Sequence, residues 1–205
     1  MEDVLDLSAE PYDARRPSVC FDERPCQLSS DTRTPLPPKP GQPQRVDYAY
    51  KREGTCHLFR TFQPLGGWRK VQVTERRPTQ DFAHWMNALV DEDFPEAEVI
   101  RVALDTLNTH SPARLYAAFA PAAARRLTRK LEFQHTPKHG SWLNMAEGER
   151  AVLSDQWLDR RIPARETMQR EVTAWEQARN AQKATVPWRF TTPEARAKLK
   201  RLSPS

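Results

Sequence analysis

The chain has 205 residues, of which 38% are hydrophobic, and a formal net charge of +5. This length suits one domain of ordinary size, with some segments outside its core. No apolar run is long enough to cross a membrane and no secretory signal pattern is present, so we expect a soluble protein without membrane association. The three cysteines lack zinc-type spacing and are expected to be reduced thiols. The excess of positive charge is modest evidence for a polyanionic partner.

The first part of the chain predicts a leader, a strand and a hairpin. Residues 1–17 contain two prolines and no apolar periodicity, so we expect an extended leader. A strand is predicted over 18–23, and the proline-rich segment 34–43 is expected to be extended and poor in internal hydrogen bonds. Segments 55–62 and 68–74 are rich in β-forming residues and flank a Gly-Gly pair, which predicts a β-hairpin.

The remainder alternates helices with two strands. Thr79 is expected to cap a helix with apolar residues at helical spacing, and the run 99–104 predicts a buried strand. Ser111 and Pro112 mark the start of a helix that ends near 119. The other predicted elements are helices over 121–130, 141–158, 164–182 and 195–202, and a strand over 131–135. The order predicts an α/β fold with a mixed sheet of about five strands flanked by helices.

Three acidic residues occupy informative places in this layout. Asp105 ends a buried strand, where open α/β sheets place ligands and catalytic groups, although it also suits a helix cap. If the first and fourth strands are neighbours, Asp22 lies beside Asp105, and helix packing can bring Glu147 to the same place. Glu23 is a rival for Asp22, but successive strand residues face opposite sides. Glu149 is a rival for Glu147 that the helical pattern does not exclude.

Carboxylates gathered in this way repel each other, and burying them without partners costs several kcal/mol. Divalent cations remove that cost, and hard oxygen ligands select Mg²⁺ or Mn²⁺. Two such ions about 3.5–4 Å apart can clamp the attacking and leaving oxygens of a phosphodiester. A site of this kind acts on nucleic-acid backbones.

Three motifs, 20–25, 104–110 and 136–147, strongly resemble those of the DDE superfamily endonucleases, specifically bacterial insertion-sequence transposases related to the mariner group. The resemblance runs from about residue 8 to the end of the chain. It implies an RNase H-like fold and metal-dependent DNA cleavage and strand transfer. It also implies that Asp22, Asp105 and Glu147 form the catalytic, metal-binding triad, with two Mg²⁺ or Mn²⁺ ions.

The resemblance also sets the expected domains and partners. We expect an RNase H-like catalytic domain over 18–182 and a basic tail over 183–205. The segment 34–43 is either a surface connection or a basic flap over DNA. Expected partners are double-stranded DNA of transposon ends and target, a separate helix-turn-helix polypeptide and a second copy in a homodimer. The expected location is the bacterial cytoplasm, at the nucleoid. The residues expected to contact DNA are Lys138, His139, Arg189, Lys198, Lys200 and Arg201.

Two alternatives stay open at this point. The first is a catalytically inactive DNA-binding remnant or accessory subunit of a transposase. It is favoured because the catalytic part begins almost at Met1, without a helix-turn-helix region, and because Thr106 and Gly148 stand where the family usually has Asn and an apolar residue. The second is a ribonuclease acting on RNA–DNA hybrids, which shares the fold and the metal chemistry but has no motif support.

Overall fold

The sheet has five strands in the order β3-β2-β1-β4-β5. The structure is a computed structural model that describes residues 2–75, 79–105, 110–137, 140, 143–154 and 158–198. β1 pairs with β2, and β2 with β3, in antiparallel fashion, whereas β4 joins β1 and β5 in parallel. The mixed sheet and the neighbouring first and fourth strands are therefore confirmed. The strands are β1 (Ser18–Asp31), β2 (Tyr50–Gln63), β3 (Trp68–Thr74), β4 (Ile100–Leu104) and β5 (Leu131–His135).

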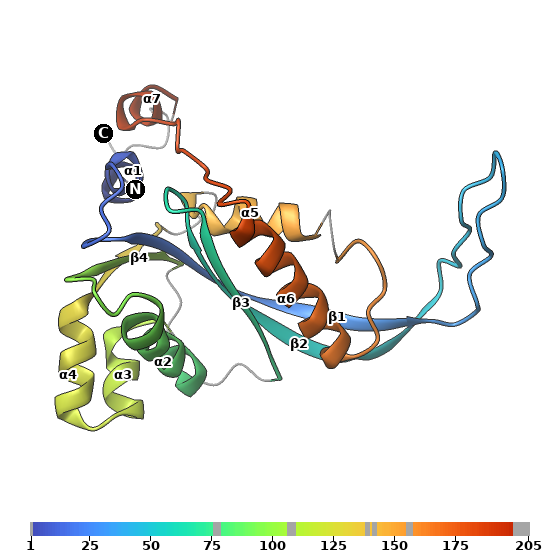
Figure 1. Cartoon of the computed structure of the whole chain (residues 1–205), viewed down its shortest axis with the longest axis horizontal. Helices are drawn as coiled ribbons and strands as arrows, with labels where there is room; N and C mark the ends of the chain where they lie inside the picture. The colour runs from blue at the N-terminus through green and yellow to red at the C-terminus, as the bar shows by residue number, and fades with distance from the viewer. Residues whose placement is uncertain are drawn as a thin grey trace.

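Helices cover both faces of the sheet (Figure 1). On one face, α2 (Thr79–Ala88) continues into a π-helical turn (Leu89–Asp93) and lies with α3 (Pro112–Ala118) and α4 (Pro121–Lys130). The other face carries α5 (Ala146–Leu153) and α6 (Arg165–Ala181). The helices expected over 112–119, 121–130 and 164–182 agree with α3, α4 and α6 to within a residue at each end.

The alternation of β1 sends successive side chains into different cores. Phe21 belongs to the larger core, beneath α2 to α4. Leu28 belongs to a second core, which includes Trp175 of α6. Cys20, which precedes Phe21, packs with Ala103 of β4 and with the first residue of α5. These small side chains allow the start of α5 to approach the sheet closely.

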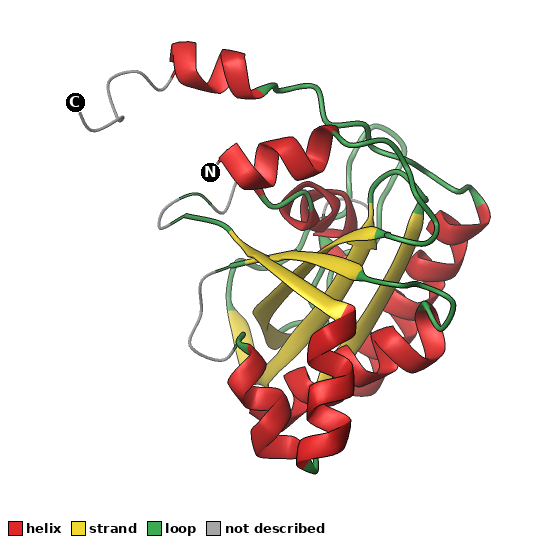
Figure 2. Cartoon of the chain, turned by 90° about the vertical axis from the view of Figure 1, so that its left-hand side faces the viewer, coloured by secondary structure: helices red, strands yellow, loops and turns green. Residues whose placement is uncertain are grey.

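Residues 2–9 form a helix, α1 (Glu2–Ala9), so the expected extended leader is wrong there. Val4 and Leu5 are each 1% exposed, and they pack with Leu143 and with Ala195 of α7 (Thr192–Lys198). Such a short helix is marginal alone, and its tertiary contacts stabilise it. Figures 1 and 2 show the two terminal helices next to each other at one side of the sheet.

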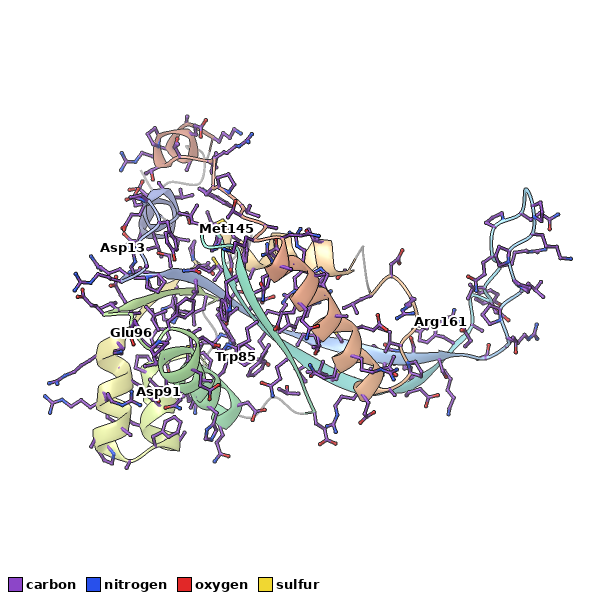
Figure 3. All side chains as sticks on the ribbon, in the orientation of Figure 1. Asp13, Trp85, Asp91, Glu96, Met145 and Arg161 are labelled. Carbon is purple, nitrogen blue, oxygen red and sulfur yellow. The ribbon has the colours of Figure 1, made fainter. Side chains whose placement is uncertain are left out.

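β1 and β2 extend further than expected, and their outer halves form an arm that projects from the sheet (Figure 1). The segment between them is largely exposed but not devoid of hydrogen bonds: backbone pairs between Leu36 and Arg45 and between Lys39 and Gln42 close it into a small hairpin. Arg161, labelled in Figure 3, donates to Asp31 Oδ1 and to the carbonyl of Asp47, each at 2.5 Å. It thereby anchors the base of this loop.

The helix expected over 141–158 is described only in part. α5 begins at Ala146, whose backbone N–H donates to the side chain of Asn144. Residues 141–142 and 155–157 lie outside the described residues.

The three cysteines are free thiols. Within the described ranges, none of the helices combines the length and the apolar character needed to span a membrane.

Candidate metal centre

Three carboxylates from separate elements meet beside the carboxyl end of β4. Asp22 of β1, Asp105 after β4 and Glu147 of α5 each offer an oxygen atom, and these atoms all lie within 4.8 Å of one another. No other group of three or more His, Cys, Asp or Glu side chains in the described part of the chain is arranged to hold a metal ion. The convergence expected from the sequence is confirmed.

The pleat of β1 decides between Asp22 and Glu23. Asp22 is buried on the α5 face, at 7% exposed. The side chain of Glu23 belongs to the opposite face, where its carboxylate lies 3.6 Å from His57 Nδ1 and 3.3 Å from His110 Nε2. As the period of a strand predicts, only one of the two joins the acidic cluster, and it is Asp22, the residue selected by the resemblance.

Asp105 is held by a residue that follows β5. The hydroxyl of Thr136 donates to Asp105 Oδ1 at 3.1 Å. The backbone N–H of Thr136 donates to the carbonyl of Leu104 at 2.9 Å, which extends the β4–β5 pairing by one step. These two bonds fix the half-buried carboxylate at the end of its strand. Thr106, which departs from the family pattern, lies outside the described residues.

Glu147 and its rival Glu149 have different partners. Glu149 accepts two hydrogen bonds from Arg69, at 2.7 and 2.9 Å, and one from Arg179 at 2.9 Å. Burial alone would raise the pKa of Glu149, but the hydrogen bonds and charges of the two arginines outweigh burial and lower this pKa. Glu149 is thus a structural ion-pair residue, and Glu147 is the member of the acidic cluster.

Asn144 joins two of the elements that carry acids, a role not expected from the sequence. Its side chain is buried, and Nδ2 donates to the carbonyl of Phe21 at 2.7 Å. Its Oδ1 accepts from the N–H of Ala146 at 3.1 Å, and its carbonyl accepts from the N–H of Glu147 at 2.9 Å. It therefore connects the residue before Asp22 to the first turn of α5. An Asn before a helix is a recognisable capping signal.

A guanidinium also reaches the cluster. Arg60 on β2 lies directly opposite Asp22 in the strand register, and its Nη2 forms an ion pair with Asp22 Oδ2. Burial lowers the pKa of Arg60 to about 10, while the charge of Glu147 acts to raise it. The group remains protonated at neutral pH. Arg60 was not singled out from the sequence, although it is the one charged residue in the run 58–62, which is otherwise uncharged and mostly apolar.

The basic residues expected to contact DNA are only partly described. Arg189 and Lys198 are exposed, and Lys198 Nζ lies 5.2 Å from the centroid of the Phe190 ring. Lys138, His139, Lys200 and Arg201 lie outside the described residues. Contact of these six residues with DNA stays a prediction.

Three solved structures with a similar arrangement of elements belong to the Mos1 transposase. The Mos1 mariner paired end complex with Mn has a TM-score of 0.58 at 14% identity, covering 89% of this chain and 55% of that chain. The Mos1 paired-end complex with left transposon end has a TM-score of 0.56 at 13% identity, covering 83% of this chain and 52% of that chain. The Mos1 Strand Transfer Complex has a TM-score of 0.55 at 14% identity, and it also covers 83% of this chain and 52% of that chain. Curated proteins give no match.

These likenesses show the fold, and the chain spans about half the length of the solved chains. The five-stranded mixed sheet with its flanking helices is RNase H-like, as expected. A family model described as DDE superfamily endonuclease matches residues 17–169, a range that includes all three clustered acids. The chain therefore belongs to the DDE superfamily of endonucleases.

Proposed function

We propose that this chain is the catalytic domain of a transposase and performs metal-dependent DNA cleavage and strand transfer. The observation that carries the proposal is the convergence of Asp22, Asp105 and Glu147 within 4.8 Å in a chain of the DDE family. The similarity in fold to the Mos1 paired-end complex with left transposon end and to the Mos1 Strand Transfer Complex supports the same conclusion.

The donor set fits a hard divalent cation, because three carboxylate groups supply the oxygen ligands that Mg²⁺ and Mn²⁺ prefer. We propose that Asp22, Asp105 and Glu147 hold two such ions. When bound, the ions supply activation of the attacking oxygen and stabilisation of the charge that develops on the phosphodiester. The task of the protein is placement: Thr136 holds the carboxylate of Asp105, and Asn144 holds α5 against β1.

The proposed substrate is double-stranded DNA, at transposon ends and at the target. Exposed Arg189 and Lys198 are proposed phosphate contacts, together with Lys138, His139, Lys200 and Arg201, since basic side chains provide the affinity for a DNA backbone. A separate helix-turn-helix polypeptide and a second copy of the chain are further proposed partners. The proposed place of action is the bacterial cytoplasm, at the nucleoid.

The test is nicking of supercoiled plasmid by the purified chain with Mn²⁺. Asp105→Asn removes one carboxylate charge from the cluster, so we expect activity to fall by about a hundredfold or more. Glu132→Gln is the matched control, because Glu132 is an exposed acid on β5, and its activity is expected to equal that of the wild type. Equal nicking by Asp105→Asn and the wild type would remove the proposed function.

One observation favours a second function, that of a non-catalytic DNA-binding accessory subunit. The guanidinium of Arg60 already contacts Asp22 and thereby supplies a positive charge to the acidic cluster. Under this alternative the chain binds DNA with an affinity that falls as salt is added. It neither nicks plasmid DNA nor releases or absorbs heat on addition of Mn²⁺. A calorimetric titration with Mn²⁺ separates the two functions.

A further inference from the structure

Arg60 is a buried cation with few partners. Its side chain is 5% exposed, its Nη2 is paired with Asp22 Oδ2, and its Nε and Nη1 form no hydrogen bond with the described part of the chain. A guanidinium carries five N–H donors, and burying it without partners is costly. The ion pair with Asp22 is therefore the interaction that holds it in place.

The strand register explains how this cation enters the cluster. Asp22 of β1 and Arg60 of β2 are directly opposed in the antiparallel ladder, so their side chains leave the sheet on the same face. That is also the face on which α5 brings Glu147 to within ligand distance of Asp22. A charge placed there acts on every cation that approaches the carboxylates.

Counting these charges gives a specific expectation for metal binding. Three carboxylates and one guanidinium leave two negative charges, which a single divalent cation balances. A second divalent cation would meet a cluster that is already neutral for as long as the guanidinium of Arg60 stays beside Asp22. In a partly buried site, one charge at such a distance changes a binding equilibrium by about tenfold or more.

We propose that Arg60 is a resident counter-cation of the metal centre, competing with divalent ions for Asp22. The protein free of DNA then binds one ion, and a second ion must displace the guanidinium. This inference rests on the metal centre of the proposed function. Arg60 acts through Asp22, so it is a positioning residue and not a catalytic one.

A cavity gives the displaced guanidinium a place to go. It has a volume of about 250 Å³ and lies between β1, β2 and the helices α5 and α6. Arg60 is one of its lining residues, along with Leu58, Leu153 and Met168. The side chain can therefore leave Asp22 without entering the packed core. The lining is mixed, because Arg24 and Arg160 also border the cavity, but its apolar members are suitable neighbours for methionine at position 60.

The experiment compares the full chain with Arg60→Met, Arg60→Lys and Arg24→Met, all free of DNA. Arg60→Met removes the charge but keeps the length of the side chain. Arg60→Lys keeps the charge. Arg24→Met is the matched control, because Arg24 is an exposed arginine two residues from Asp22 that lines the same cavity. The probe is Mn²⁺ alone, with the free ion followed by electron paramagnetic resonance and the heat by calorimetry.

We expect the wild type to bind one Mn²⁺ and Arg60→Met to bind two, the first about tenfold more tightly than in the wild type. Arg60→Lys and Arg24→Met should resemble the wild type. In thermal unfolding, Mn²⁺ should raise the melting temperature of Arg60→Met more than that of the wild type, because tighter ligands stabilise the folded state more.

Two results would overturn the inference while leaving the metal centre in place. One is the binding of two Mn²⁺ ions of similar affinity by the wild type, which needs no variant to fold. The other is an Arg60→Met isotherm equal to or weaker than that of the wild type. Absence of Mn²⁺ binding in both proteins would instead contradict the proposed function, and this inference with it. Asp105→Asn should abolish binding, which assigns the ions to this cluster.

Discussion

At Asn144, one amide side chain joins the strand that carries Asp22 to the helix that carries Glu147. Replacing it by alanine leaves the buried carbonyl of Phe21 without its donor and α5 without its cap. We expect Asn144→Ala to lower the free energy of unfolding by about 1–3 kcal/mol and to weaken Mn²⁺ binding. Urea denaturation and Mn²⁺ titration provide the two measurements.

Asn144→Asp serves as its partner variant. The aspartate retains an acceptor for the N–H of Ala146 but offers no donor to Phe21. Stability close to that of the wild type in Asn144→Ala would show that neither hydrogen bond matters. Normal stability combined with normal Mn²⁺ affinity in Asn144→Asp would show that the bond to β1 does not position Glu147.

Gly148, which departs from the family pattern, is expected to be replaceable. A Cβ atom at this position has no neighbour within 4 Å, and the residue lies exposed in α5. Gly148→Ala should therefore raise the free energy of unfolding by about 0.5–1 kcal/mol, because alanine loses less backbone entropy in a helix. Gly67→Ala is the contrasting variant: φ is +65° and a Cβ atom would lie 2.6 Å from the backbone of Lys183. In chemical denaturation, the free energy of unfolding should rise in Gly148→Ala and fall in Gly67→Ala. A loss of stability in Gly148→Ala would contradict the expectation.

The residues of the site differ in how far the sequence reveals them. Asp105 follows from its place at the end of a buried apolar run, whereas strand periodicity showed only that one of Asp22 and Glu23 joins it, and the resemblance selected Asp22. The choice of Glu147 over Glu149 came from the resemblance, because the helical pattern allowed both. Arg60 depends on the register between β1 and β2. A register is a property of two strands together, so neither strand alone indicates which residues face each other.

Among the elements, α6 has a second task besides covering the sheet. Its polar side chains pair with the backbone of the edge strand β3: Gln169 accepts from the N–H of Val73 at 2.9 Å, and Glu176 from that of Val71 at 2.5 Å. Asn180 exchanges two hydrogen bonds with the backbone of Arg69. These contacts satisfy groups that would otherwise be available to another strand.

Glu176 gives a prediction with a sign in pH. Burial raises its pKa above the ordinary value of 4.5, despite the N–H of Val71 and the charge of Lys70. A raised pKa in the folded state means that this carboxyl contributes stability at low pH and loses it as pH rises through the folded pKa. Gln does not titrate and keeps an acceptor oxygen. As pH rises from the ordinary pKa of 4.5 through the raised folded pKa, we therefore expect Glu176→Gln to become more stable relative to the wild type. Urea denaturation at several pH values measures this difference in the free energy of unfolding.

Glu176→Leu is the control for the hydrogen bond. It leaves the N–H of Val71 without this acceptor and should lower the free energy of unfolding by about 1 kcal/mol or more at neutral pH. If the stabilities of Glu176→Gln and the wild type changed in parallel with pH, the carboxyl would not be titrating as described.

Element boundaries were predictable where local signals mark them. Prolines at the first helical positions of α3 and α4 fixed both starts. Tertiary contacts determined the boundaries of α1, β1 and β2. α1 depends on packing against α7, and the ends of β1 and β2 beyond Leu28 pair with each other outside the core. Polar, exposed strand residues of that kind carry no burial pattern for periodicity to detect.

At the scale of the whole molecule, the two ends of the chain form one support for the site. α1 and α7 enclose Leu143, which lies four residues before Glu147. Arg196 of α7 also donates to Glu2 of α1 at 2.7 and 2.8 Å, but both groups are exposed and such pairs contribute little. The apolar contact is therefore the part that stabilises this support.

Leu5→Ala tests whether the ends of the chain contribute to the site. Leu5 is 1% exposed, and truncating it leaves a cavity beside Leu143, so we expect a loss of about 2 kcal/mol or more in the free energy of unfolding. Because Leu143 leads into α5, Mn²⁺ affinity should fall as well. Tyr12→Ala, at a side chain 55% exposed, should change neither quantity. A Leu5→Ala protein that lost stability but kept its Mn²⁺ affinity would show that the terminal helices stabilise the fold without positioning Glu147.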